Sequence, residues 1–274
     1  MAGTLYLVPT PIGNLGDISR RCVEILEMAD FIAAEDTRVT LKLLNHLGLK
    51  KPLISYYRHN TDEAGGKVLE RLLAGENAAL CTDAGTPAVS DPGEDLVALC
   101  AQNGVEVVAI PGPCALITAL AVSGLPTARF TFEGFLPMNK KNRRERLEVL
   151  AKEERTMILY EAPHKLVATL TDLAEALGGE RRVSVCRELT KLHEEILRTT
   201  LGQAGEKYRT EAPRGEFVLV VEGAPLQKEE ATLDDGLARV EELMARGLSR
   251  KDAVKQAAAQ LGLSRNELYD AAHS

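Results

Sequence analysis

The sequence predicts an α/β protein with two sheet domains and a small helical segment at its C-terminus. Short apolar runs rich in Val, Ile and Leu alternate with amphipathic stretches, first up to about residue 137 and again from about residue 155. This alternation is typical of strands that alternate with covering helices. Beyond residue 231 the periodicity is helical only. At 274 residues with 45% hydrophobic residues, the chain is long enough to bury two cores.

The first alternating set predicts an N-terminal α/β domain over residues 1–137. Its expected strands are residues 4–9, 30–35, 52–57, 77–82, 106–112 and 130–137. Its expected helices are residues 19–29, 39–48, 65–76, 94–104 and 114–124. The alternation indicates a mostly parallel sheet covered on both faces, with ligands bound at the carboxyl ends of its strands.

The second alternating set predicts another α/β domain over residues 156–224, after a basic linker at 138–155. Continued alternation assigns residues 155–163, 181–189 and 215–223 to strands, and residues 165–179 and 194–208 to helices. After a polar hinge at 224–231, residues 231–274 read as three short helices. The turn "GLSR" occurs twice there, at Gly247 and Gly262, and each copy supplies a glycine stop and a serine N-cap. Such a helix-turn-helix-like segment serves either as a packing or dimerisation module or as a reader of nucleic-acid grooves.

Composition restricts the compartment and the metal chemistry. No apolar run approaches the ~20 residues of a membrane span, and the N-terminus lacks the pattern of a signal peptide. We therefore expect a cytoplasmic protein without a membrane partner. The five cysteines are scattered without a C-x-x-C pair, and four of them lie in apolar stretches. This pattern favours buried, reduced thiols, and we predict no metal site.

One local cluster of positive charge stands out on an acidic chain. The net charge of −7 argues against a nucleic-acid partner, since phosphate binding depends on Lys and Arg. Residues 138–155 nevertheless begin with Lys140, Lys141, Arg143, Arg144 and Arg146. The cluster is either a phosphate-binding arm or a solvated helix face with charge pairs between residues i and i+4.

Three loops rich in Gly and Pro follow predicted strands, at residues 9–17, 82–93 and 110–115. The common nucleotide-binding, zinc-protease and serine-hydrolase motifs are missing from the sequence. Loops of this composition expose main-chain donors and acceptors and permit close approach of a flat, polar ligand such as a nucleoside-like cofactor. The longest loop could instead be a plain surface connection.

At these loops the sequence resembles the tetrapyrrole methylase superfamily of S-adenosylmethionine-dependent methyltransferases, and within it the branch of ribosomal RNA small subunit methyltransferases I. The resemblance continues through "AAEDTR" (33–38), "YEAPHK" (160–165), "RELTK" (187–191) and "PRGEFVLVVEG" (213–223) and covers nearly the whole chain. Porphyrin-methylating relatives carry Gly-Asp-Pro where this chain has Gly85-Thr86-Pro87. That difference favours the RNA branch.

The resemblance implies two α/β domains with S-adenosylmethionine in the cleft between them, usually in a homodimer. It also implies methylation of the ribose 2′-hydroxyl of a cytidine in the decoding centre of the small ribosomal subunit, in its 16S rRNA. The residues that it implies as cofactor contacts are Pro9, Asp83, Ala84, Gly85, Thr86, Pro87, Pro113, Cys114, Ala115, Tyr160, Glu161, Gly215 and Glu216.

The reaction itself suggests candidate catalytic residues. A ribose hydroxyl is a weak nucleophile, so a hydrogen-bond acceptor or general base should orient it in line with the methyl group. The candidates fall into two clusters, Glu35 with Asp36 and Lys191 with Glu194. Asp36 could equally be the cap of the following helix or half of a surface ion pair. The residues predicted to bind RNA are Arg38, Lys140, Lys141, Arg143 and Arg144.

Two other functions fit the same sequence. A methyltransferase of this fold that acts on a tetrapyrrole or another small acceptor would need an apolar acceptor pocket and no basic arm. A non-enzymatic RNA-binding assembly factor would use the arm and the C-terminal helices, and its loops would be only structural. Binding of S-adenosylmethionine or S-adenosylhomocysteine would separate an enzyme from an assembly factor.

Overall fold

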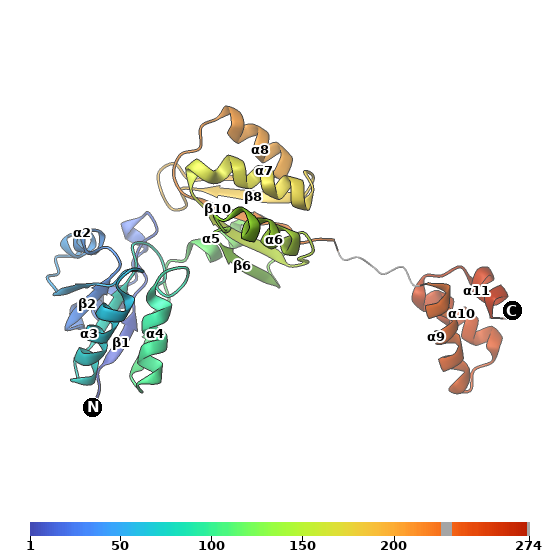
Figure 1. Cartoon of the computed structure of the whole chain (residues 1–274), viewed down its shortest axis with the longest axis horizontal. Coiled ribbons are helices and arrows are strands. Elements are labelled where there is room, and N and C mark those ends of the chain that lie inside the picture. The colour runs from blue at the N-terminus through green and yellow to red at the C-terminus, as the bar shows by residue number, and fades with distance from the viewer. Residues whose placement is uncertain (226–231, 273–274) are drawn as a thin grey trace. The chain divides into compact units, whose positions relative to one another are not determined.

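The computed structural model describes residues 1–225 and 232–272. These residues form two compact units, residues 1–224 and residues 225–274, and each is described by itself. The first unit contains both sheets, and the described residues of the second form helices and their connecting turns (Figure 1). None of the helices described is both long and apolar enough to cross a membrane.

The first sheet is fully parallel and has the strand order β3-β2-β4-β1-β5. Its strands are β1 (Thr4–Leu7), β2 (Phe31–Ala34), β3 (Leu53–Ser55), β4 (Ala78–Cys81) and β5 (Glu106–Ala109). Helices α1 (Arg20–Met28) and α2 (Thr37–Leu47) pack on one face, and α3 (Thr61–Leu73) and α4 (Gly93–Gln102) pack on the other. The predicted parallel sheet with two covered faces is confirmed.

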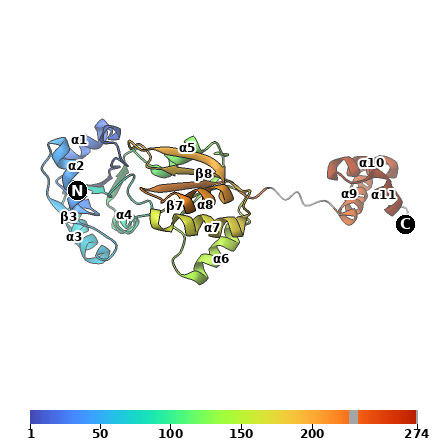
Figure 2. The same cartoon turned by 90° about the horizontal axis from the view of Figure 1, so that it is seen from above.

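The second sheet is mixed and has the order β6-β7-β10-β8-β9. Its strands are β6 (Phe130–Gly134), β7 (Thr156–Glu161), β8 (Arg182–Arg187), β9 (Glu195–Thr200) and β10 (Phe217–Val221). The pair β6–β7 is parallel, whereas β7–β10, β10–β8 and β8–β9 are antiparallel. Helices α6 (Lys140–Leu150), α7 (Leu166–Leu177) and α8 (Leu201–Thr210) pack on one face, and α5 (Ala115–Ser123) packs on the opposite face (Figure 2).

Three features of this second sheet differ from the sequence-based prediction. Helix α5 and strand β6 belong to the second sheet, although we expected the first domain to extend to residue 137. Residues 138–155 are not a plain linker, because they contain α6, whose Leu147 and Leu150 are buried in the second core. The stretch 194–208 divides into β9 and α8, because the Thr200 hydroxyl accepts the Gln203 N–H and starts a new helix.

The second unit is a three-helix cluster with its own core. Helices α9 (Leu233–Ala245), α10 (Arg250–Leu261) and α11 (Arg265–Ala271) enclose a small apolar core that includes Val240, Val254 and Leu268. Ser249 and Ser264 cap α10 and α11 with their side chains, as the two "GLSR" turns predicted. Residues 231, 273 and 274 of the predicted segment lie outside the described residues.

Candidate functional site

The three Gly/Pro-rich loops meet at the carboxyl edge of the first sheet. Thr10 and Gly85 exchange main-chain hydrogen bonds, with N···O distances of 2.9 and 3.0 Å. The Thr86 hydroxyl donates to the Pro113 carbonyl at 2.9 Å. A Cβ atom on Gly112 would lie only 2.7 Å from the Pro9 ring, so only glycine permits this contact. Loops that are far apart in the sequence are therefore joined into one surface.

The long loop after β4 is braced from within. Ala88 and Ser90 have positive φ angles of 66° and 67°, a conformation that costs free energy unless the surroundings enforce it. The Asp91 carboxylate enforces it by accepting main-chain N–H groups of Ala88 at 3.0 Å, Val89 at 3.3 Å and Gly93 at 2.7 Å. Its turn-forming residues thus build a fixed loop, in contrast to a plain surface connection.

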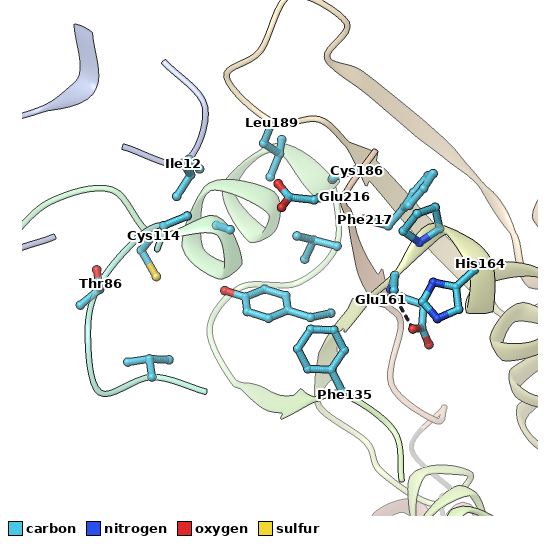
Figure 3. A pocket seen from close by; sticks show the side chains of 18 residues that line it. Ile12, Thr86, Cys114, Phe135, Glu161, His164, Cys186, Leu189, Glu216 and Phe217 are labelled. Carbon is cyan, nitrogen blue, oxygen red and sulfur yellow. Dashed lines mark hydrogen bonds between the residues drawn. The ribbon is translucent and has the colours of Figure 1, made fainter. Parts of the chain in front are cut away.

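A cavity of about 520 Å³ lies between this loop surface and the second sheet. The loop side supplies mostly small side chains, namely Ile12, Ala84, Gly85, Thr86, Val89, Cys114 and Ala115. The side of the second sheet supplies Phe135, Tyr160, Glu161, Ala162, Pro163, His164, Cys186, Leu189, Glu216, Phe217 and Val218. In Figure 3, Thr86 and Cys114 lie on one side of the view and Glu161 and His164 on the other, with the Phe135 ring between them.

Tyr160 supplies an aromatic wall near the end of β7. Its ring makes edge contacts with Phe132 and Phe135, at centroid distances of 5.0 and 5.8 Å. Burial raises the pKa of Tyr160 to about 12. The phenol is therefore neutral at physiological pH and can donate or accept a hydrogen bond.

Glu161 places a carboxylate in the cavity wall, although the residue is only 5% exposed. One oxygen accepts the Ala162 N–H at 2.8 Å, and the other accepts the Thr169 hydroxyl from α7. The same hydroxyl accepts an Arg143 N–H at 2.8 Å, while the Arg143 Nε donates to Asp172 at 2.6 Å. Arg143 is therefore connected to Glu161 in the cavity wall by the Thr169 hydroxyl, and its side chain is only 17% exposed.

Lys191 links two carboxylates at the edge of the cavity. Its Nζ lies 2.8 Å from Glu188 Oε1 and 2.8 Å from Glu216 Oε2, and Glu216 lines the cavity. Burial disfavours the charge on Lys191, but the two carboxylates outweigh this effect and raise its pKa. The group is thus a held ammonium and a hydrogen-bond donor. Glu194 accepts the Thr190 N–H at 2.6 Å and closes the same loop.

Glu35 and Asp36 do not line the cavity. The Asp36 carboxylate caps α2 by accepting the Arg38 N–H at 2.8 Å, and it pairs with the Arg38 guanidinium at 2.6 Å. Hydrogen bonding to Arg38 lowers the pKa of Asp36 to about 2. Glu35 accepts the Thr82 hydroxyl, and Asp83 accepts the Asp36 N–H at 3.0 Å. The hydrogen bonds of Glu35 and Asp83 connect the residues that follow the carboxyl ends of β2 and β4.

The predicted cofactor residues divide into two sets. Those that line the cavity are Ala84, Gly85, Thr86, Cys114, Ala115, Tyr160, Glu161 and Glu216. Pro9, Asp83, Pro87, Pro113 and Gly215 lie outside the lining. Three of these residues support the residues that line the cavity or its edge. Pro9 packs on Gly112, the Pro113 carbonyl accepts the Thr86 hydroxyl, and Gly215 leaves room for the Glu188 side chain.

Sequence reasoning missed Ile12, Val89, Phe135, Ala162, Pro163, His164, Cys186, Leu189, Phe217 and Val218, which also line the cavity. Eight of them lie inside the Gly/Pro-rich loops or the motifs "YEAPHK", "RELTK" and "PRGEFVLVVEG", and Cys186 directly precedes "RELTK", so membership of these motifs was the available signal. Phe135 has no such signal, because it follows β6, a strand that we expected in the first domain.

The predicted RNA-binding residues of α6 point in different directions. Lys140, Lys141 and Arg144 are exposed, whereas Arg143 turns inward to Thr169 and Asp172. Lys141 and Arg144 pair with Glu145 and Glu148 one turn away, at 3.9 and 3.0 Å. Such exposed pairs are weak and leave both cations available to a phosphate.

The cysteines are free thiols, as predicted, and Cys22, Cys81, Cys100 and Cys186 are buried. Burial raises the pKa of the Cys186 thiol, which lines the cavity together with Cys114. Within residues 1–225 and 232–272, no three His, Cys, Asp or Glu side chains gather as ligands for a metal ion.

The model of the family Tetrapyrrole (Corrin/Porphyrin) Methylases matches residues 4–205, and the model of the RsmI C-terminal HTH domain matches residues 230–274. The ribosomal RNA small subunit methyltransferase I of Synechocystis sp. is 51% identical over 268 residues, which cover 97% of this chain and 96% of that protein. The protein of the same name from Bacillus subtilis is 44% identical and covers 99% of this chain and 94% of its own length.

Solved structures show the same fold. The uroporphyrin-III C-methyltransferase of Thermus thermophilus, in complex with S-adenosylhomocysteine, has a TM-score of 0.57 and 18% identity and covers 80% of this chain and 97% of its own. A cobalt precorrin-4 methyltransferase has a TM-score of 0.59 and 21% identity and covers 80% of this chain and 94% of its own.

Proposed function

The chain belongs to the tetrapyrrole methylase family, whose cofactor is S-adenosylmethionine, and we propose that it methylates the 16S rRNA of the small ribosomal subunit at the 2′-hydroxyl of a cytidine ribose in the decoding centre. One observation carries the RNA assignment. The similarity to ribosomal RNA small subunit methyltransferases I extends over 97–99% of this chain, including the C-terminal helical unit.

The cavity fits this cofactor in size and chemistry. Its volume of about 520 Å³ lies within the range of roughly 300–1,000 Å³ that is usual for ligand sites. Gly85 has no side chain to block the loop wall, and Tyr160 offers an apolar ring. Glu161 retains lone pairs that can accept N–H or O–H donors of a nucleoside or an amino acid. We assign the cofactor to Gly85, Thr86, Cys114, Tyr160 and Glu161.

When bound, S-adenosylmethionine supplies an electrophilic methyl group on a sulfonium centre. The protein must hold the acceptor oxygen in line with that group, and positioning of this kind can supply up to roughly 7–11 kcal/mol. The braced loop after β4 and the buried Glu161 favour such positioning, since neither can move without breaking several hydrogen bonds.

The geometry favours Lys191 and Glu216 over Asp36 and Glu35 as the groups that face the acceptor. Glu216 lines the cavity, has a side chain that is 77% exposed, and is held by Lys191. A protonated Lys191 cannot serve as a base, but it orients Glu216, which can accept the hydroxyl proton or a hydrogen bond. We interpret Asp36 as the cap of α2, and Glu194 as a brace of the Lys191 loop.

We assign RNA phosphate contacts to Lys140, Lys141 and Arg144, and we retain Arg38 because its side chain is 86% exposed. Arg143 is removed from this set, because its guanidinium is engaged by Thr169 and Asp172. A cytoplasmic location, a homodimer and binding to the small ribosomal subunit belong to the same proposal. They rest on the family resemblance.

The proposal is tested with small subunits isolated from a strain that lacks this gene. The purified protein and labelled S-adenosylmethionine are expected to add one methyl group, mapped to a cytidine 2′-oxygen by mass spectrometry of nuclease fragments. Label on a base, or on free uroporphyrinogen but not on RNA, would contradict it. Binding of S-adenosylhomocysteine without transfer to any acceptor would favour an assembly factor. Naked 16S rRNA, tested in parallel, shows whether the assembled subunit is required.

A further inference from the structure

An aromatic side chain stands exposed at the edge of the cavity. Phe135 is 57% exposed, although burying a phenylalanine is normally favourable. It lines the cavity (Figure 3), and its ring contacts the Tyr160 ring edge to face, with the centroids 5.8 Å apart. The strand register of β6 shifts between Phe132 and Gly134, and Gly134 has a φ of 59°. Irregularities of this kind re-aim the side chains that follow them.

The neighbours of Phe135 fix its direction and extend the exposed surface. Leu136 is buried in the second core and anchors the segment. Met138 is 74% exposed, and the Asn139 side chain then caps α6. The exposed Lys140, Lys141 and Arg144 follow directly. Within ten residues the chain runs from the cavity wall through an exposed ring to a group of cations.

We propose that Phe135 is a stacking platform for the base of the nucleotide that is methylated, and that this nucleotide is bound unpaired. The inference rests on the proposed RNA methylation and identifies the form of the substrate. Single-stranded RNA is recognised by aromatic rings that stack on bases and by cations that follow the phosphates. Both elements are present here within ten residues of one another, and the aromatic one lines the cavity.

The unpaired state follows from access. A ribose 2′-hydroxyl must enter a cavity whose wall includes Glu216, while its base lies against Phe135, the exposed part of the cavity lining. A base that remains stacked in a duplex cannot lie face to face with a protein ring, so the nucleotide must be extruded or already single-stranded. The exposure of Phe135 also contrasts with that of Glu161, which is only 5% exposed within the wall assigned to the cofactor.

The test compares Phe135→Ala, Phe135→Leu and Phe135→Trp with Phe130→Ala. Phe130 is a matched control, because it lies at the start of β6, is 37% exposed and does not line the cavity. Two affinities are measured for each variant, one for S-adenosylhomocysteine and one for small subunits that lack the methyl group. Loss of a base–aromatic stack should weaken the second affinity by about 5- to 150-fold in Phe135→Ala.

The expected pattern has four parts. Affinity for S-adenosylhomocysteine falls far less than affinity for the subunit in Phe135→Ala. Phe135→Trp binds the subunit like the wild type, Phe135→Leu resembles Phe135→Ala, and Phe130→Ala changes neither affinity. Unchanged subunit binding in Phe135→Ala would overturn the proposal, as would full rescue by Leu or a parallel loss of S-adenosylhomocysteine affinity. A wild-type protein that methylates no RNA would instead overturn the proposed function itself.

Discussion

The two sides of the cavity differ in the size and polarity of their side chains. The first sheet contributes loops whose side chains are small and whose main chain is held by hydrogen bonds between loops, such as those of Thr10 with Gly85. The second sheet contributes large and polar side chains, among them Tyr160, Glu161 and Glu216. The small side chains of the loops therefore leave the space of the cavity open. The second sheet supplies the aromatic ring and the carboxylates that can contact a ligand.

The difference follows from strand direction. In the parallel first sheet, all carboxyl ends lie at one edge, and the loops that follow meet there. In the second sheet, β10 runs antiparallel to β7 and β8, so that Phe217 at its start pairs with Glu161 and Arg187 at their ends. The start of one strand and the ends of two others thus line the same cavity. Substitutions on the loop side should change the shape of the cavity, whereas substitutions on the side of the second sheet should change its hydrogen bonds and charges.

The largest effect is expected at Gly85, on the loop side. Gly85 has a φ of 86°, and a Cβ there would lie 3.3 Å from Ile12. Gly85→Val forces a β-branched residue into a left-handed conformation at the cavity wall, which should weaken cofactor binding by about 100-fold or more. The measurement is calorimetric titration with S-adenosylhomocysteine.

Gly48→Val is the matched control for Gly85→Val. Gly48 has a similar φ of 72° at the end of α2, and a Cβ there would meet no atom within 4 Å. The control substitution should lower the unfolding temperature and leave affinity for S-adenosylhomocysteine unchanged. Near-normal affinity in Gly85→Val would show that shape on the loop side is not critical.

The second largest effect is expected at Lys191. Lys191→Met keeps most of the aliphatic volume but leaves Glu188 and Glu216 without their shared cation. Loss of a charge-assisted hydrogen bond should lower single-turnover methylation by about 10- to 100-fold. Lys191→Arg should recover part of the rate. A fully active Lys191→Met would show that Glu216 needs no support from this side chain.

A smaller effect is expected at Thr169, behind the cavity wall. Thr169→Val removes the hydroxyl that joins Glu161 to Arg143, while the side chain keeps its shape. Affinity for S-adenosylhomocysteine should fall by about 5- to 10-fold, the cost of one buried hydrogen-bond partner. Thr171→Val on the same helix is the control. That hydroxyl donates to the Val167 carbonyl and accepts an Arg209 N–H at 3.3 Å, and neither partner lines the cavity. Equal affinities in the two variants would contradict a role of Thr169 in holding Glu161.

The smallest effect is expected at Asp36. Asn caps a helix about as well as Asp, so Asp36→Asn should change methylation less than twofold at neutral pH. The effect of this substitution on protein stability should appear at acidic pH. Since Arg38 lowers the folded-state pKa of Asp36 from 3.8 to about 2, its contribution to stability is present above about pH 4 and is lost as the pH falls toward 2.

Unfolding curves between pH 2 and pH 7 should therefore show a shallower acid slope for Asp36→Asn than for the wild type. A loss of methylation by two orders of magnitude at neutral pH, with normal stability, would instead make Asp36 a catalytic group. That outcome would assign the catalytic group to the first sheet and not to Glu216 of the second sheet.

The sequence by itself determined the first sheet, its Gly/Pro-rich loops and the capped C-terminal helices. These features depend on local patterns, namely apolar periodicity, glycine at turns and serine at helix starts, which a single segment carries. The resemblance through Gly85-Thr86-Pro87 and Tyr160-Glu161 then identified the family.

Only the tertiary structure decided the directions of the strands in the second sheet, the side to which β6 belongs, and the partners of each charge. Alternation does not distinguish a parallel from an antiparallel β10, because direction depends on which strands become neighbours. Arg143 and Arg144 are adjacent in one basic run, yet one is bound to Thr169 and the other is exposed. The sequence left Asp36 open between a base, a helix cap and an ion pair, and its carboxylate caps α2 and pairs with Arg38. A charge acquires its role from the groups packed around it, and those groups are distant in sequence.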